Sequence, residues 1–320
     1  MHIVIIGAGG IGGYFGARLI QAGAQVSFVA RGAHGQAIAE HGLRVTSALG
    51  DALVRPHAVA ATPAALAVAL AAAGLAPADL IVFAVKLPDA EAAAATLAPL
   101  LHPGCIVLPL QNGVDVTELL GAQIGAEAVA AGVAYIATKV AGPGVIEHGG
   151  PFARLRFGAL QPAQEPCLRA FLAACQGAGI DAEMPPDIRR TLWEKFVFLV
   201  GLSSLTALTR QPVGVIRAEP EMRHLLRQVM DEVCTLARAE GQALATDFAD
   251  QQMALADSIP AHMKASMLHD LEAGRRLELP WLAAAVVRRS AGLGLQAPAC
   301  RFVAAALTPY VNGAAGQGTA

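Results

Sequence analysis

The chain has little charge of either sign. Charged residues make up 15% of its 320 residues, and the formal net charge is −2. A surface with so little net charge provides no strong field for nucleic acid or for an anionic membrane. We therefore expect neither as a partner.

Metal and disulfide patterns are also missing. The five cysteines are scattered and form no C-x-x-C pair, and the nine histidines form no H-x-x-x-H or H-x-H cluster. An odd number of scattered cysteines is typical of reduced thiols rather than of a disulfide framework or a zinc site. We predict a cytoplasmic protein without a bound metal.

No targeting or membrane-spanning segment is expected. The apolar N-terminus lacks a basic region and is interrupted by glycines. Every apolar run of about 18 residues is broken by a charge, a proline or a glycine cluster. Hydrophobic residues make up 55% of the chain, but many are alanines, which favours a helix-rich protein.

The most informative stretch is the first thirty residues. His2 to Ile6 is a short β-branched run typical of a strand buried in a parallel sheet. A glycine-rich loop follows, then a predicted helix at Tyr14–Gln21 and a second predicted strand at Gln25–Ala30. This order of strand, loop, helix and strand is that of a Rossmann βαβ unit.

The loop has the sequence Gly7-Ala8-Gly9-Gly10-Ile11-Gly12, a G-x-G-x-x-G pattern. In such a loop Gly7 allows the tight turn, Gly9 lets a pyrophosphate approach the backbone, and Gly12 lets the helix pack closely on the strand. The helix N-terminus favours the anion. The loop therefore predicts a dinucleotide site; the alternative is a glycine-rich turn that is only structural.

The residue after the second strand bears on which dinucleotide is bound. NAD sites usually place an acidic residue there to bind the ribose, whereas this chain has Arg31. A guanidinium can hold a 2′-phosphate with two hydrogen bonds, and a carboxylate would repel it. We therefore predict NADP(H), the alternative being that Arg31 is an ordinary exposed arginine.

The α/β pattern continues to about residue 186. Strands are expected at 43–46, 52–60, 79–86, 105–110, 128–138, 144–148 and 154–157, and helices at 63–73, 89–101 and 114–120. Lys86 and the Gln111-Asn112-Gly113 turn follow two of the buried strands. Ligands collect at the carboxyl ends of such strands, so we expect Lys86 and Asn112 to contact a ligand.

Beyond Pro185 and Pro186 the strand pattern disappears. Helices are expected at 188–208, 220–240, 248–256, 260–277, 280–291 and 298–307. The sequence thus predicts a Rossmann domain over residues 1–186, an all-helical domain over 187–312 and a flexible tail over 313–320.

Lys195 stands out in the first of these helices. It lies in Thr191-Leu192-Trp193-Glu194-Lys195-Phe196-Val197-Phe198, which is otherwise largely aromatic and apolar. Burial would lower the pKa of its ammonium toward the range of a general acid. The alternative is a lysine that extends along its stem to solvent.

The motifs together resemble the ketopantoate reductase (2-dehydropantoate 2-reductase) family, NADPH-dependent enzymes with a Rossmann domain and a helical domain. The resemblance covers nearly the whole chain. It rests on GAGGIGGYFGARL with Arg31, on the strand that ends at Lys86, on QNG at 111–113, on LWEKF around Lys195, and on SMLHDLEAGRRLE from Ser266 to Glu278.

The resemblance implies the roles of the site residues. Lys195 would be the general acid, and Glu278 would hydrogen-bond near the reacting oxygen. Ser266, with Ser203, would help hold the substrate, and Asn112 would lie near nicotinamide and substrate. Arg31 and Lys86 would hold the phosphates of NADP(H), and the substrate would be a small 2-oxo acid, most simply ketopantoate. The sequence leaves open whether the protein is a monomer or a homodimer.

The chain departs from the family pattern at four positions. Leu199 and Ser203 stand where relatives have asparagines, and Ala283-Ala284 replaces an Asn-Gly pair. Lost hydrogen-bond groups weaken polar recognition. The departures favour a 2-oxo acid that is less polar than ketopantoate where Leu199 faces it.

Three other interpretations explain fewer of these motifs. Tyr135 and Lys139 form the Y-x-x-x-K of a short-chain dehydrogenase, but in a strand context and without the glycine spacing of that family. A non-enzymatic NADP(H) sensor would explain the lost asparagines but not the retention of Lys195, Glu278 and Ser266. A helical module that serves only for oligomerisation would explain none of these motifs.

Overall fold

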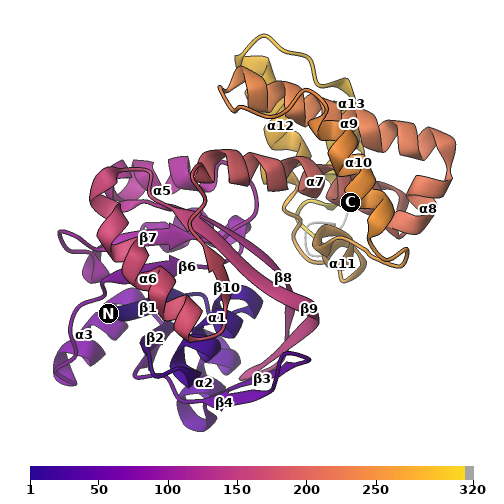
Figure 1. Ribbon diagram of the computed structural model, residues 1–320. Helices are drawn as coiled ribbons and strands as arrows, with labels where there is room; N and C mark the ends of the chain where they lie inside the picture. Colours follow the sequence, from indigo (N-terminus) through magenta and orange to yellow (C-terminus); the bar gives the residue numbers. More distant parts are fainter. Residues whose placement is uncertain (314–320) are drawn as a thin grey trace. The chain divides into compact units, whose positions relative to one another are not determined.

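A computed structural model describes residues 1–313, and over them the chain forms two units with separate apolar cores (Figure 1). Unit 1 comprises Met1–Gln111 and Val116–Ile188, and unit 2 comprises Asn112–Asp115 and the chain from Arg189 onward. The sequence did not indicate that residues 112–115 belong with the helical part. Of the predicted tail, only Gly313 is among the described residues.

The first sheet of unit 1 is entirely parallel. Its order is β5-β2-β1-β6-β7. The strands are β1 (His2–Ile6), β2 (Gln25–Val29), β5 (Val59–Ala60), β6 (Leu80–Phe83) and β7 (Ile106–Pro109). The order reverses between β1 and β6, which is the switch point of a doubly wound sheet. The predicted Rossmann fold is confirmed.

A second sheet completes unit 1. Its order is β10-β9-β3-β4, and β8 pairs with β9. The strands are β3 (Leu43–Ser47), β4 (Ala52–Val54), β8 (Ala131–Gly142), β9 (Val145–Gly158) and β10 (Asp181–Glu183). Helix α1 (Gly10–Gln21) contacts strands of both sheets, because its apolar side chains are buried on more than one side.

The other helices of unit 1 are short. They are α2 (Gly32–His41), α3 (Pro63–Ala72), α4 (Ala90–Ala94), α5 (Val116–Ile124) and α6 (Glu165–Gly177), with the 3₁₀ turns η1 (Leu87–Asp89), η2 (Ala98–Leu100), η3 (Ala126–Ala128) and η4 (Pro162–Gln164). Helices α2 and α6 were not predicted.

Three predictions for unit 1 were wrong. The strands expected at 144–148 and 154–157 form one strand, β9. Proline explains the other two. The strand expected at 52–60 is split into β4 and β5, which belong to different sheets, with Pro56 between them. Proline has no N–H to donate to a ladder. The helix expected at 89–101 consists of η1, α4 and η2, and Pro99 lies within the last of these.

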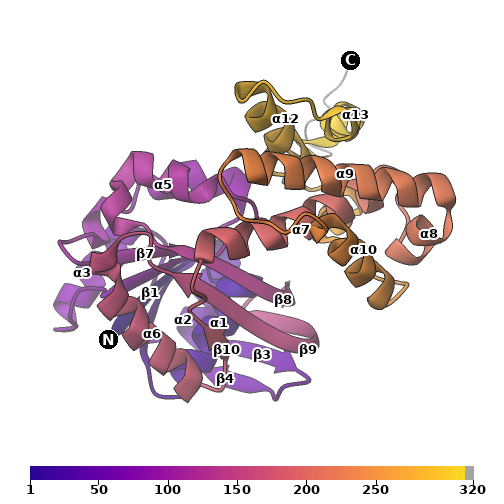
Figure 2. The same ribbon diagram turned by 45° about the horizontal axis from the view of Figure 1, so that its top comes forward.

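Within the described part of unit 2 every element is helical, which confirms the predicted all-helical second part. The helices are α7 (Ile188–Thr209), α8 (Val213–Ala218), α9 (Pro220–Ala239), α10 (Phe248–Ser258), α11 (Ser266–Glu272), α12 (Ala283–Gly292) and α13 (Pro298–Leu307), with η5 (Leu279–Trp281) and η6 (Thr308–Tyr310). Helix α9 contacts α10, α12 and α13 (Figure 2).

Helix α7 supplies several side chains to this core. Phe196, Val197 and Val200 are buried, and Gly201 lies so close to Met230 of α9 that an added Cβ would come within 2.8 Å of it. By length and composition α7 is the one described helix that could span a membrane, although no membrane-spanning segment was expected. Burial of 61% of its most apolar window in this core accounts for its composition.

The stretch from 260 to 277, predicted as one helix, is helical only in α11. The chain leaves the helix at Ala273, and Gly274 has a φ of +62°, a conformation that favours glycine. Helix α11 begins at Ser266 rather than at residue 260, and Glu278 lies beyond its end. Helix α8 was not predicted.

Candidate active site

The glycine-rich loop of unit 1 lies between β1 and α1. Gly9 is the N-cap of α1, no side chain caps it, and no acidic residue lies in the first turn. The helix begins at Gly10, earlier than the predicted Tyr14. Uncapped backbone N–H groups at the positive end of a helix are well suited to binding an anion.

Two of the three motif glycines have the structural roles expected of them. Gly7 has a φ of +97°, and an added Cβ would come within 2.9 Å of the backbone of Ala84. A Cβ on Gly12 would come within 2.9 Å of the Ile5 side chain, so close packing of α1 on β1 requires glycine there. A Cβ on Gly9 would meet nothing within 4 Å, and the open space fits a pyrophosphate against the backbone.

His34 of α2 supports this loop, although its sequence context did not indicate this role. Its Nδ1 accepts a hydrogen bond from the Gly144 N–H at 3.0 Å. The other ring nitrogen, Nε2, then carries the proton and donates to the carbonyl of Ala8 at 2.8 Å. No motif marks His34, since its two partners come from distant parts of the chain.

Arg31 and Lys86 are both exposed. Arg31 precedes α2 as its N-cap, and its side chain is 75% exposed. Its guanidinium lies 3.9 Å from the carboxylate of Asp89, a weak ion pair at such exposure. Lys86 is the N-cap of η1 after strand β6.

In unit 2 the amide of Asn112 joins Lys195 and Glu278. Lys195 Nζ donates to Asn112 Oδ1 at 2.9 Å, and Asn112 Nδ2 donates to Glu278 Oε2 at 3.2 Å. The amide orientation is consistent with both charges, because its oxygen faces the ammonium and its nitrogen faces the carboxylate. Three residues that are distant in sequence thus form one polar cluster.

The environment of Lys195 lowers its pKa. Burial in α7 disfavours the ammonium and lowers the pKa from 10.5 to about 8, although the nearby Glu278 carboxylate acts in the opposite direction. A lysine with this pKa is largely protonated at neutral pH and can release its proton readily. It therefore suits general-acid chemistry.

The other predicted substrate residues differ in accessibility. Ser266 is exposed at the start of α11, whereas Ser203 of α7 is fully buried. The Ser203 hydroxyl has no hydrogen-bond partner among the described residues. Leu199 is partly buried and packs on the apolar core, and Ala283 begins α12, where it is fully buried.

The Y-x-x-x-K pair does not form a site. Tyr135 and Lys139 both lie on β8, as expected. Four residues of strand span roughly 13 Å, too far for the two side chains to act on one atom. Lys139 instead pairs with Glu147 on β9 at 2.9 Å. Over residues 1–313 no group of three or more His, Cys, Asp or Glu side chains could hold a metal ion.

Comparison with known proteins identifies the family. The family model for ketopantoate reductase PanE/ApbA matches residues 3–162, and the model for the C-terminal part of the same family matches residues 187–311. The chain therefore belongs to the ketopantoate reductase family, a family of oxidoreductases, which confirms the resemblance seen in the motifs.

Individual relatives match over almost the whole length. A 2-dehydropantoate 2-reductase of Mesorhizobium japonicum is 33% identical over 89% of this chain and 90% of that protein. The crystal structure of a PanE/ApbA family ketopantoate reductase from Ralstonia eutropha is 32% identical, with a TM-score of 0.85 over 97% of this chain and 98% of that one. A D-mandelate dehydrogenase, solved with NADH and anilino(oxo)acetate, has a TM-score of 0.84 over 97% of this chain and 98% of its own, but at 19% identity it shows the fold alone.

Proposed function

We propose that this protein reduces a 2-oxo acid to the 2-hydroxy acid with NADPH, the first candidate being 2-dehydropantoate (ketopantoate) to pantoate. The observation that carries the proposal is the cluster of Lys195, Asn112 and Glu278, in which the lysine pKa is lowered to about 8. Family membership and the whole-length match to a 2-dehydropantoate 2-reductase support it.

Reduction of a ketone adds a hydride to the carbonyl carbon and a proton to its oxygen. The reduced nicotinamide supplies the hydride. Lys195 is the proposed source of the proton: its ammonium hydrogen-bonds the ketone oxygen and gives up one proton as negative charge develops there. The resulting neutral amine is the form that burial favours, and it regains a proton from solvent before the next turnover.

Asn112 and Glu278 hold Lys195 in place for this step. Asn112 Oδ1 accepts from the ammonium, and the carboxylate of Glu278 balances its charge through the Asn112 amide. Glu278 is also the proposed hydrogen-bond partner of the substrate near the reacting oxygen. Proton transfer needs such positioning, because small misplacements of the donor are costly.

The residues of unit 1 fit a bound dinucleotide. The pyrophosphate would bind at the glycine-rich loop, since Gly9 leaves space and α1 presents uncapped N–H groups. The loop consists of Gly7, Ala8, Gly9, Gly10, Ile11 and Gly12. Arg31 and Lys86 are the proposed partners of the phosphate at the adenosine end, and Asn112 is proposed near the nicotinamide. Arg31 stands where an NAD site usually has an acidic residue, and its guanidinium is exposed. Both features favour NADP(H) over NAD(H).

The substrate carboxylate is assigned to Ser266, with Ser203 as a second polar contact. The unpartnered hydroxyl of Ser203 supports this, because a buried polar group normally has a partner. Leu199 and Ala283 support a second candidate within the same chemistry, a 2-oxo acid with a more apolar side chain than ketopantoate.

The test is NADPH oxidation by purified protein with ketopantoate and with a panel of apolar and aromatic 2-oxo acids. Wild type should turn over at least one of them, and Lys195→Ala should lose most of that activity. Lys139→Ala, which removes an exposed lysine outside the cluster, is the matched control and should remain active. Activity lost in Lys139→Ala but kept in Lys195→Ala would revive the short-chain dehydrogenase mechanism. Tight NADPH binding without turnover of any acid would indicate a sensor.

A further inference from the structure

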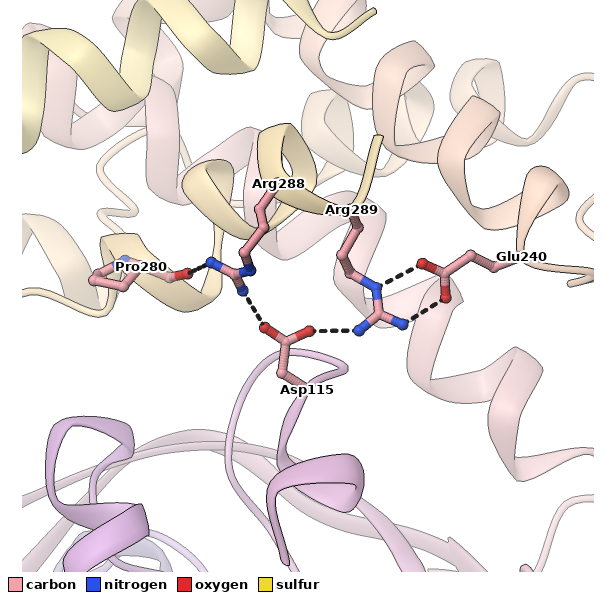
Figure 3. Close-up of polar contacts among 5 residues, drawn as sticks. All are labelled: Asp115, Glu240, Pro280, Arg288 and Arg289. Carbon is pink, nitrogen blue, oxygen red and sulfur yellow. Dashed lines mark hydrogen bonds and ion pairs between the residues drawn. The ribbon is translucent and has the colours of Figure 1, made fainter. Parts of the chain in front are cut away.

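Asp115, the last residue of the segment 112–115, is bound by two arginines of α12 (Figure 3). Arg289 Nη1 donates to Asp115 Oδ1 at 2.9 Å, and Arg288 Nη2 donates to Asp115 Oδ2 at 2.7 Å. The side chains of Asp115 and Arg289 are only 16% and 18% exposed. Charge-assisted hydrogen bonds on both carboxylate oxygens fix the position and rotation of Asp115.

Arg289 is itself oriented by Glu240, the C-cap residue of α9. Its Nε and Nη2 donate to the two carboxylate oxygens of Glu240 at 2.6 and 2.7 Å, which leaves Nη1 directed at Asp115 (Figure 3). A planar guanidinium can donate to two carboxylates in fixed directions at once, whereas a lysine ammonium has no such fixed arrangement of donors. Asp115 is therefore positioned with respect to α9 as well as α12.

The same network reaches the segment that carries Glu278. Arg288 Nη1 donates to the carbonyl of Pro280, and Pro280 lies in η5, directly after Glu278. Gly113 also packs on η5: its φ is +92°, and an added Cβ would come within 3.1 Å of the Trp281 carbonyl. Neighbours of both hydrogen-bonded residues are thus held in place: Gly113 next to Asn112, and Pro280 close to Glu278.

We propose that Asp115, through Arg288 and Arg289, is a positioning residue that sets where Asn112 lies with respect to Lys195 and Glu278. Only three peptide bonds separate Asp115 from Asn112, and the segment between them has little freedom because Val114 is buried and Gly113 is closely packed. A shift of Asp115 must therefore move Asn112. The expected effect on catalysis rests on the proposed function, but the geometric coupling does not.

The test variant is Asp115→Asn, which keeps the shape of the side chain and removes its charge. The matched control is Asp257→Asn, since Asp257 also accepts two hydrogen bonds from one arginine, Arg223, but lies outside this network. Misplacement of a catalytic group by about 1 Å costs up to roughly a hundredfold. We expect Asp115→Asn to lower kcat at least tenfold with a smaller change in KM, and Asp257→Asn to change neither.

A double mutant separates positioning from general destabilisation. If Asp115 acts through Asn112, then Asp115→Asn should cause almost no further loss of kcat in an Asn112→Ala background. Equal losses in both backgrounds would contradict the proposal. Should Asp115→Asn fail to fold, Arg288→Gln is the milder variant, since it removes one of the two arginines and its side chain is 59% exposed.

A measurement that needs no activity completes the test. The rate at which Lys195 is reductively methylated is followed against pH by mass spectrometry, with Lys139 and Lys264 as internal references. Loss of the Asn112 acceptor disfavours the ammonium, so Asp115→Asn should move the labelling midpoint of Lys195 to lower pH by roughly half a unit or more. An unchanged midpoint and unchanged kcat would overturn the proposal. Full activity of Lys195→Ala would instead overturn the proposed function, while the midpoint would still decide whether Asp115 positions Asn112.

Discussion

The pH dependence of reduction tests the Lys195 cluster most directly. Lys195 must be protonated to act as the acid, so kcat/KM for reduction should be constant below its pKa and fall as pH rises through about 8. Glu278 raises this pKa against the effect of burial. Glu278→Gln removes the negative charge and keeps the shape, and should therefore move the fall to lower pH.

The size of the shift follows from the charge that is removed. An opposite charge at 4–6 Å changes a pKa by roughly 1–3 units. We take about one unit, because the amide of Asn112 lies between the two groups. At pH 8 the wild-type lysine would be about half protonated and the variant lysine about one-tenth. When kcat/KM is expressed relative to its low-pH plateau, the value at pH 8 should be about fivefold lower in the variant than in wild type.

The assay is NADPH oxidation from pH 5.5 to 9.5 at low substrate concentration. Glu278→Gln should also lower the low-pH plateau of kcat/KM if Glu278 contacts substrate. Only the pH at which kcat/KM falls reports on the pKa of Lys195. Lys195→Arg serves as the control, because arginine stays protonated over this range and should abolish the fall. A fall at the same pH in wild type and Glu278→Gln, or one that persists in Lys195→Arg, would refute the assignment of the acid to Lys195.

Other substitutions test the remaining parts of the site. Arg31→Ala should weaken NADPH binding by roughly 10- to 100-fold and leave NADH binding almost unchanged, as measured by cofactor fluorescence; equal losses for both would contradict NADP(H) specificity. Leu199→Asn should shift the kcat/KM ratio toward ketopantoate and away from apolar 2-oxo acids, and no change in that ratio would show that Leu199 does not face the substrate. Ser203→Ala should raise KM several-fold if the hydroxyl binds substrate; an unchanged KM with a raised Tm would identify it as a buried polar group without a ligand role.

The parts of the fold that the sequence predicted well are those coded by neighbouring residues. The glycine loop follows from local spacing: Gly12, for example, is required by the side chain of Ile5, seven positions earlier. Lys195 could be identified because its immediate neighbours in α7 are aromatic and apolar. In both cases the environment of the residue can be read from about ten positions on either side.

The parts that could not be predicted depend on contacts between distant segments. Asp115 and Arg289 are 174 positions apart, and no local pattern links them. The hints were weak: an acidic residue two positions after the QNG turn, and two adjacent arginines in an otherwise apolar stretch. The error in the helix expected at 260–277 has a different origin, since helical propensity continued through Ala273 while Gly274 ended the helix in the folded chain.

The four residues from Asn112 to Asp115 have a consequence for dividing the protein. The chain leaves the Rossmann unit for this short segment and then returns to it, so a cut near residue 186 doesn't separate two complete modules. An isolated helical fragment would keep Lys195 and Glu278 but lack the amide that joins them, and it would leave Arg288 and Arg289 without their carboxylate. A chimera that exchanges helical parts between relatives would therefore need to exchange this tetrapeptide together with the C-terminal half. Recombination within the family is then constrained at two places in the gene rather than one.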